Sequence, residues 1–144
     1  MDPRDFLQVA GRLTLASGST AADYRTAISR AYYGVYHLAR QLLNDRLQFF
    51  CNVDNEHLWV QRHYYNCQMK AAKEIGRPLG NLHEARKNAD YDLDDPGIET
   101  SAAARFQLER ARAIQSSIQT CIDPANIETL KTEMTAYRAK ANLR

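Results

Sequence analysis

A stretch with helical periodicity, Tyr24–Leu43, constrains the fold of this chain more than any other segment does. Its only Gly or Pro is Gly34. Its apolar residues recur at intervals of three and four, as they do along one face of an amphipathic helix. These residues are Tyr24, Ala27, Ile28, Ala31, Val35, Leu38, Ala39 and Leu42. The stretch therefore predicts a long helix with a buried apolar face.

The other faces of this helix carry residues that are unusual for a solvated surface, where Lys, Glu and Gln are more common. One neighbouring row consists of Arg25, Ser29, Tyr32 and Tyr36, and the row opposite the apolar face consists of Arg30, Tyr33, His37 and Arg40. The two rows indicate that the helix is covered on more than one side. It is either a core helix whose tyrosines pack and bond locally, or a surface for a partner or ligand.

Helix-start signals mark both ends of the chain. Asp2-Pro3 predicts a short first helix, because an N-cap followed by Pro is a typical helix start. Ser19 and Thr20 offer caps for the long second helix, which we expect to run to about Asn44. Asp123-Pro124 repeats the first signal and predicts a last helix.

Between these ends, turn residues predict three more helices. We expect a third helix over residues 55–75, closed by Gly76 and Pro78, because Gly commonly ends a helix and Pro cannot continue one. A fourth helix is expected over residues 79–91 and a fifth over residues 100–121, with a turn at Pro96-Gly97 between them. Phe49 and Phe50, in the loop before the third helix, are expected to be tucked in.

No segment predicts a strand, and no linker divides the chain. The predicted fold class is therefore all-α: a bundle of five to six helices with one long central helix, in a single domain over residues 1–144.

The composition excludes several classes of protein. The formal net charge is only +2, so any contact with RNA must be local. No apolar run approaches the roughly 20 residues of a membrane span, and the first residues lack the apolar core of a signal peptide. Cys51, Cys67 and Cys121 have no CxxC spacing, which is typical of reduced thiols. We expect a cytoplasmic protein without membrane contact.

The most informative segment after the long helix is LHEARKNADYD, residues 82–92. Arg86 falls on the apolar side of its helix, and Asp90 follows one turn later, so the two can form an ion pair. An inward pair needs further hydrogen bonds, which Ser29 and the tyrosines and arginines of the long helix can supply. The segment is either a buried polar network that fixes helix register or a functional site.

Four acidic residues crowd the end of this helix, where negative charge opposes the helix dipole. They are Asp90, Asp92, Asp94 and Asp95. Either the helix stops before Asp92 or nearby arginines neutralise the cluster.

Other chemical signals are weak. His63 and Cys67 lie one turn apart, but no further pair has metal-ligand spacing, and no nucleotide-binding loop or dinucleotide fingerprint is present. We therefore expect neither a metal nor a cofactor. His57 and His83 are single histidines, expected to be surface or capping groups.

The segments YRTAISRAYYGVYHLARQLL and LHEARKNADYD, in this order, resemble the HEPN family (higher eukaryote and prokaryote nucleotide-binding domains). A later LERARAI segment also fits, so that the resemblance covers about residues 24–122. It implies a small helical bundle that forms a homodimer. Many members are metal-independent ribonucleases of toxin–antitoxin and other defence systems, and others are non-catalytic and work beside a nucleotidyltransferase partner.

In the ribonuclease members an arginine is followed, after four to six residues, by a histidine. Arg86 matches the arginine, but the expected histidine position is Tyr91. Tyrosine has a reference pKa of about 10 and is a poor general base near neutral pH. The departure favours a member that binds without cleaving.

Two hypotheses follow from the resemblance. The favoured one is a dimeric module that binds nucleotide, RNA or a partner protein through the two rows of the long helix. Its candidate residues are Arg25, Ser29, Arg30, Tyr32 and Tyr33, with support from Asp90 and Arg86. The alternative is an active metal-independent ribonuclease in which Arg86 holds the scissile phosphate and Tyr91 is the second catalytic group.

Overall fold

The computed structural model describes residues 1–143, which form six α-helices and no strand. In chain order the helices are α1 (Arg4–Leu15), α2 (Ala21–Gln41), α3 (Glu56–Tyr65), α4 (Lys70–Tyr91), α5 (Ser101–Ile122) and α6 (Pro124–Lys140). A π-helical turn, Leu42–Arg46, extends α2, and a 3-10 turn, Pro96–Ile98, precedes α5. The predicted all-α class is confirmed. Among these residues, no helix is both long and apolar enough to cross a membrane.

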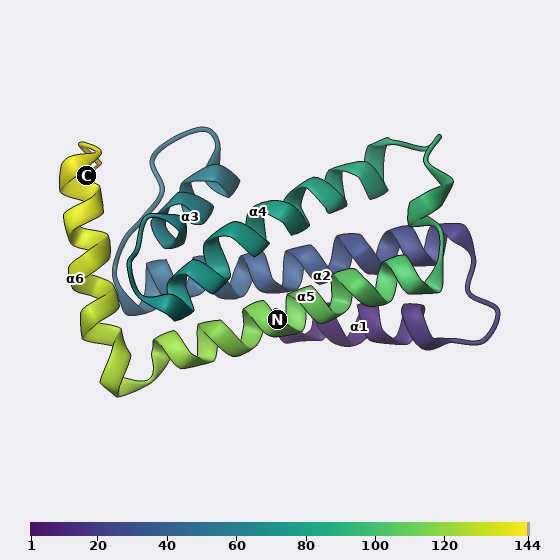
Figure 1. The fold of residues 1–144 in the computed structure, drawn as a ribbon, viewed down its shortest axis with the longest axis horizontal. Coiled ribbons are helices and arrows are strands. Elements are labelled where there is room, and N and C mark those ends of the chain that lie inside the picture. The colour runs from purple at the N-terminus through teal and green to yellow at the C-terminus, as the bar shows by residue number, and fades with distance from the viewer. Residues whose placement is uncertain (144) are drawn as a thin grey trace.

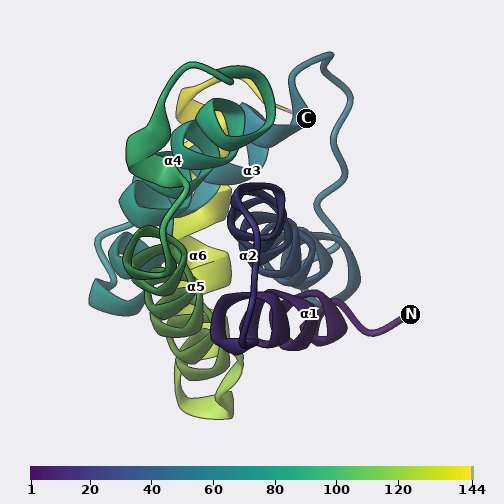
Figure 2. The same cartoon turned by 90° about the vertical axis from the view of Figure 1, so that its right-hand side faces the viewer.

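Four helices, α1, α2, α4 and α5, run alternately up and down along the long axis of the molecule (Figure 1). The helices α2 and α5 contact each other, and each also contacts α1 and α4. Figure 2 shows this arrangement from the end, with α1 and α4 on opposite sides of the inner pair. The centre of the bundle is therefore shared by α2 and α5. The prediction of one long central helix is not confirmed, since α2 has 21 residues and α4 and α5 have 22 each.

The start of α2 follows from its sequence. The Thr20 side chain accepts a hydrogen bond from the main-chain N–H of Asp23, and the Asp23 carboxylate accepts one from the N–H of Thr20. This capping box satisfies two N–H groups that the first turn would otherwise leave free. The row of Arg25, Ser29, Tyr32 and Tyr36 is buried as well as most of the apolar row. The prediction that α2 is covered on more than one side is confirmed.

The predicted boundary at Gly76 and Pro78 is wrong. The third helix ends at Tyr65, and α4 runs from Lys70 through both residues to Tyr91. Gly76 does not end a helix but allows α4 to pack closely on α3. A Cβ added to it would lie 2.5 Å from the main-chain N and Cα of Tyr65. An interior proline costs about 3 kcal/mol. The buried side chains of Ile75, Leu79 and Leu82 offset this cost, since each contributes about 1.5–3 kcal/mol.

The loop between α2 and α3 departs from expectation at one residue. Phe49 is half-buried, with the guanidinium carbon of Arg138 lying 4.5 Å from its ring centroid. Phe50 is exposed, so the prediction that both rings are tucked in is wrong for Phe50.

The last helix, α6, lies across one end of the bundle (Figure 1). It buries Leu130 and Met134. Its Glu133 carboxylate accepts hydrogen bonds from the main-chain N–H groups of Gln68 and Met69, immediately before α4. The carboxylate thus caps α4 at the end where the helix dipole favours negative charge.

Candidate functional site

Arg86 lies on the face of α4 that packs on α2, and only 7% of its surface is exposed. Its guanidinium carbon lies 5.5 Å from the ring centroid of Tyr32 and 5.4 Å from that of Tyr33. Cations within about 6 Å of an aromatic face are attracted to it. The two tyrosines of α2 therefore hold this cation in place.

The polar partners of Arg86 balance its charge only in part. Nη1 lies 3.5 Å from Oδ2 of Asp90, and Nη2 donates to Nε2 of His83 at 3.0 Å. The Nε atom is buried and has no hydrogen-bond partner in residues 1–143. A tight pair between a guanidinium and a carboxylate is about 2.7–2.9 Å long. Asp90, whose side chain is 30% exposed, is therefore a loose counter-ion, and Ser29 Oγ donates to it at 3.3 Å.

A second cation, Arg30, lies next to this pair. Its guanidinium carbon is 5.1 Å from the ring centroid of Tyr33, and its Nη2 donates to Ser29 Oγ at 3.4 Å. No carboxylate in the described chain lies within 4.0 Å of it. The Tyr33 ring thus lies against two guanidinium groups, and the neighbourhood holds two positive charges and one carboxylate.

Two histidines complete the group, and sequence reasoning missed both. The rings of His57, from α3, and His83, from α4, stack at 4.9 Å with an interplanar angle of 14°. The Tyr32 hydroxyl lies 2.6 Å from Nδ1 of His57, and the Tyr32 ring stacks on His83. Both rings are partly exposed, as expected for surface groups, but neither caps a helix: His57 contacts the Tyr32 hydroxyl and His83 contacts Arg86. For His83 the signal was its position three residues before Arg86, which places both on one face.

Burial keeps the side chains of His83, His57 and Tyr32 uncharged near pH 7. Burial, together with the neighbouring His57 and the Arg86 cation, lowers the pKa of His83 to about 4. Burial also lowers the pKa of His57 and raises that of Tyr32 well above its ordinary value. We call this group the Arg86 cluster: Arg86, Asp90, His83, Ser29, Arg30, Tyr32, Tyr33 and His57.

Arg25, a candidate binding residue by sequence, lies outside the cluster. Its guanidinium donates to the main-chain oxygens of Asn88, Ala89, Asp92 and Asp95, and it pairs with Glu99 at 2.8 Å. A cation at a helix C-terminus satisfies free carbonyl groups and complements the dipole. Of the two alternatives for the acidic end of α4, the first is confirmed, since the helix stops at Tyr91, before Asp92. Arg25 binds main-chain oxygens there, and its carboxylate partner is Glu99.

Tyr91 points away from the cluster. It is 76% exposed, and it lines a shallow surface hollow with Glu84, Lys87, Asn88 and Asp92. Within one copy of the chain the structure does not bring Tyr91 and Arg86 together. The two can form one site only if a second copy supplies one of them.

The His63–Cys67 pair has local hydrogen bonds. Nδ1 of His63 lies 2.7 Å from the main-chain oxygen of Trp59, and the Cys67 thiol donates to the oxygen of His63. Residues 1–143 hold no group of three His, Cys, Asp or Glu side chains placed to share a metal ion.

No protein-family model, curated protein or solved structure matches this chain. The chemistry of the Arg86 cluster must therefore be inferred from its own geometry.

Proposed function

We propose that this chain is a HEPN-like module that binds the phosphate of an RNA or nucleotide at the Arg86 cluster. The observation that supports this proposal is that the charge of Arg86 is only partly neutralised. Its buried guanidinium has one loose counter-ion, Asp90, at 3.5 Å and one neutral hydrogen-bond acceptor, His83. Phosphate oxygens match the fork of a guanidinium better than a single distant carboxylate oxygen does. Arg30 supplies a second cation, and the tyrosines supply aromatic faces.

The proton-transfer groups of the cluster favour binding over cleavage. A general base works best when its pKa lies near the working pH. Burial lowers the pKa of His83 to about 4, so this imidazole is a weak base at pH 7. Tyr91 makes no contact with Arg86 in one copy of the chain. We therefore propose a HEPN-like protein that binds without cleaving. The resemblance adds the proposed setting, a toxin–antitoxin or defence system in which the protein works beside a nucleotidyltransferase partner.

A second candidate function is a metal-independent ribonuclease. One observation favours it: the Tyr91 ring is 76% exposed and makes no contact with Arg86 of its own chain, so a homodimer could supply Tyr91 of one protomer to Arg86 of the other. The two candidates make different predictions for RNA cleavage.

The test combines binding and cleavage. Fluorescence anisotropy with a 5′-phosphorylated oligouridylate should show binding that Arg86→Gln weakens at least tenfold, because a charged hydrogen-bonding group is lost. The matched control is Arg105→Gln, an exposed arginine on α5, which should bind as wild type does. Equal binding by Arg86→Gln and wild type would overturn the proposal.

Cleavage is assayed on the same RNA with a chelator present. The proposal expects little or no cleavage by wild type. In a homodimer that brings residue 91 beside Arg86 of the partner, Tyr91→His should raise cleavage, because imidazole restores a group that titrates near neutral pH and general acid–base catalysis contributes about 10²–10⁴-fold. Robust wild-type cleavage that Arg86→Gln abolishes would establish the ribonuclease instead.

The homodimer is tested by light scattering at micromolar concentration. One chain has a mass of 16.4 kDa, so a dimer should scatter as about twice that mass. A monomer would exclude the site shared between protomers and leave binding at the Arg86 cluster as the function.

A further inference from the structure

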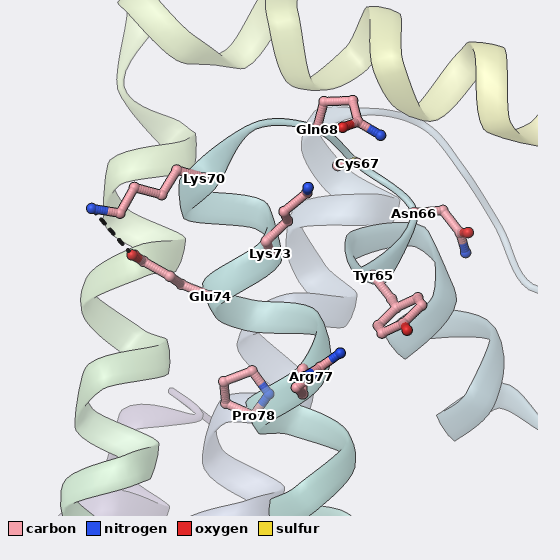
Figure 3. A pocket seen from close by; sticks show the side chains of 9 residues that line it. All are labelled: Tyr65, Asn66, Cys67, Gln68, Lys70, Lys73, Glu74, Arg77 and Pro78. Carbon is pink, nitrogen blue, oxygen red and sulfur yellow. Dashed lines mark ion pairs between the residues drawn. The ribbon is translucent and has the colours of Figure 1, made fainter.

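A groove follows the line where α3 packs on α4. Its first part is a hollow of about 550 Å³ beside the first turns of α4 (Figure 3). Its second part, of about 370 Å³, extends along the two helices as far as His83. Tyr65 and Arg77 line both parts, so the two hollows lie next to each other along the same pair of helices. We call this feature the α3–α4 groove. It ends at a histidine that accepts a hydrogen bond from Arg86.

Two glycines on α4 shape the groove. A Cβ on Gly76 would lie 2.5 Å from the main chain of Tyr65, and a Cβ on Gly80 would lie 2.3 Å from Nε2 of Gln61. Their spacing of one helical turn places both against α3. The close approach of the helices fixes Tyr65 at the edge of the groove, where half of its surface is exposed.

The groove carries two cations without counter-ions. Lys73 and Arg77 are one turn apart on α4, and both are directed toward the side formed by Asn66 and Tyr65 (Figure 3). No carboxylate in residues 1–143 lies within 4.0 Å of either. Glu74 also lines the first hollow, but its carboxylate is directed away from Lys73 and Arg77 (Figure 3): it pairs with Lys70 at 3.7 Å and accepts a hydrogen bond from Ser117. Like charges one turn apart are unfavourable alone, and an anion would relieve them.

We infer that the α3–α4 groove binds single-stranded nucleic acid. Sites for such strands combine a cationic groove that follows the phosphates with aromatic side chains on which bases stack. Lys73 and Arg77 supply the cations, and Tyr65 supplies the aromatic face. A free phosphate would use only the cations, and a duplex has no exposed base face for Tyr65.

The inference rests on the proposed function and extends it. Lys73 and Arg86 are 13 residues apart on one helix, which corresponds to about 20 Å at 1.5 Å per residue. A single phosphate cannot contact both. A strand that lies along both hollows reaches from Lys73 past Tyr65 to His83, the member of the Arg86 cluster that lines the second hollow, so the ligand is a polynucleotide rather than a mononucleotide.

The test measures the affinity of a labelled 12-residue oligouridylate at several salt concentrations. The double variant Lys73→Gln/Arg77→Gln should weaken binding and reduce the slope of log K against log salt by roughly 1.4, since each phosphate contact on a single strand contributes about 0.7. The matched control, Arg105→Gln/Lys131→Gln, removes two exposed charges from α5 and α6 and should keep the wild-type slope. A double variant with the wild-type slope would overturn the inference.

Stacking is tested at Tyr65. Tyr65→Leu should weaken binding of the strand at least fivefold, because stacking contributes about 1–3 kcal/mol per base. Tyr65→Phe keeps the ring and should bind as wild type does. Equal loss in both variants would show that the ring is not a stacking surface. A 12-base-pair duplex or a polyglutamate peptide that binds as tightly as the oligouridylate would also overturn the inference, and oligothymidylate shows whether the sugar matters.

The two proposals fail in different ways. If Arg86→Gln weakens binding and the groove variants do not, the groove inference is wrong and the proposed function stands. If the groove variants weaken binding and Arg86→Gln does not, the groove binds the strand and the Arg86 cluster does not. If wild type binds neither the oligonucleotide nor a mononucleotide such as uridine 5′-monophosphate, both are wrong.

Discussion

Nη1 of Arg25 donates a hydrogen bond of 3.0 Å to the main-chain oxygen of Ala89. A side chain in the second turn of α2 therefore holds the last turn of α4. The helix that carries Arg86 is fixed at its end by a residue 64 positions earlier in the chain.

Replacing Arg25 with Met should destabilise the protein by about 3 kcal/mol. The change keeps most of the apolar stem and leaves buried carbonyl groups and Glu99 without their donor, which is costly for charged hydrogen bonds. Urea unfolding measures the loss. The control, Arg105→Met, should change the free energy of unfolding by no more than about 0.5 kcal/mol. A loss as small as the control's would mean that Arg25 is not a structural clamp.

Replacing Gly76 or Gly80 of α4 with alanine should have opposite effects on the stability of the protein. Gly76→Ala gains about 1 kcal/mol of helix propensity but forces a Cβ against the main chain of Tyr65, and overpacking costs about 1–3 kcal/mol. We expect net destabilisation. Gly80→Ala meets only the end of the Gln61 side chain, which can rotate away, so this variant should be as stable as wild type or more so. Thermal unfolding compares them, and a stabilising Gly76→Ala would contradict the close helix contact.

Arg86 and Asp90 should be coupled weakly in the folded protein. Breaking a fully buried pair costs about 3–5 kcal/mol, but the Asp90 side chain is 30% exposed and its oxygen lies 3.5 Å from Nη1. A double-mutant cycle with Arg86→Met and Asp90→Asn should give an interaction energy of about 1 kcal/mol. A value near 4 kcal/mol would show that Asp90 neutralises Arg86 tightly, which would remove the basis for phosphate binding there.

Acid should destabilise the protein through buried histidines. Burial lowers the pKa of His63 to about 4 from its ordinary 6.5, so the unfolded chain binds more protons between these values. The stability contribution is therefore complete above pH 6.5 and is lost as the pH falls toward 4. Within this window one such histidine contributes a slope of up to about 1.4 kcal/mol per pH unit.

The variant His63→Gln tests this assignment. It should be less stable at pH 7, because the hydrogen bonds to Trp59 and Arg138 are disturbed, but its free energy of unfolding should fall less steeply between pH 6.5 and 4. His37 is partly exposed and its pKa is lowered less, so His37→Gln should flatten the curve less. A slope unchanged by His63→Gln would show that the imidazole is protonated as easily in the folded state as in the unfolded state.

Local signals in the sequence were sufficient to predict a helix end where that end depends only on residues next to it in the chain. The Thr20–Asp23 capping box begins α2, the Thr100 side chain caps α5, and Asp123-Pro124 begins α6. Each signal acts within four residues, so no knowledge of the fold was needed. The ion pair between Arg86 and Asp90 was predictable for the same reason.

The features that sequence reasoning missed depend on contacts between helices. Gly76 is compatible with a helix end and with a close helix crossing, and only the position of α3 decides between them. His57 joins the Arg86 cluster from a different helix, and nothing beside it in the chain marks it. Arg25 and Arg30 lie in adjacent rows of α2, yet one caps α4 and the other lies against Tyr33, because their directions depend on packing.

The Glu133 carboxylate that caps α4 has a consequence for the order of events during synthesis. The N–H groups of Gln68 and Met69 donate to the Glu133 carboxylate, which is translated about 65 residues later. Until α6 has left the ribosome, the first turn of α4, which carries Lys73, lacks this acceptor. A nascent chain would therefore cap the start of α4 only after Glu133 has been translated, when the residues of the Arg86 cluster have already been synthesised.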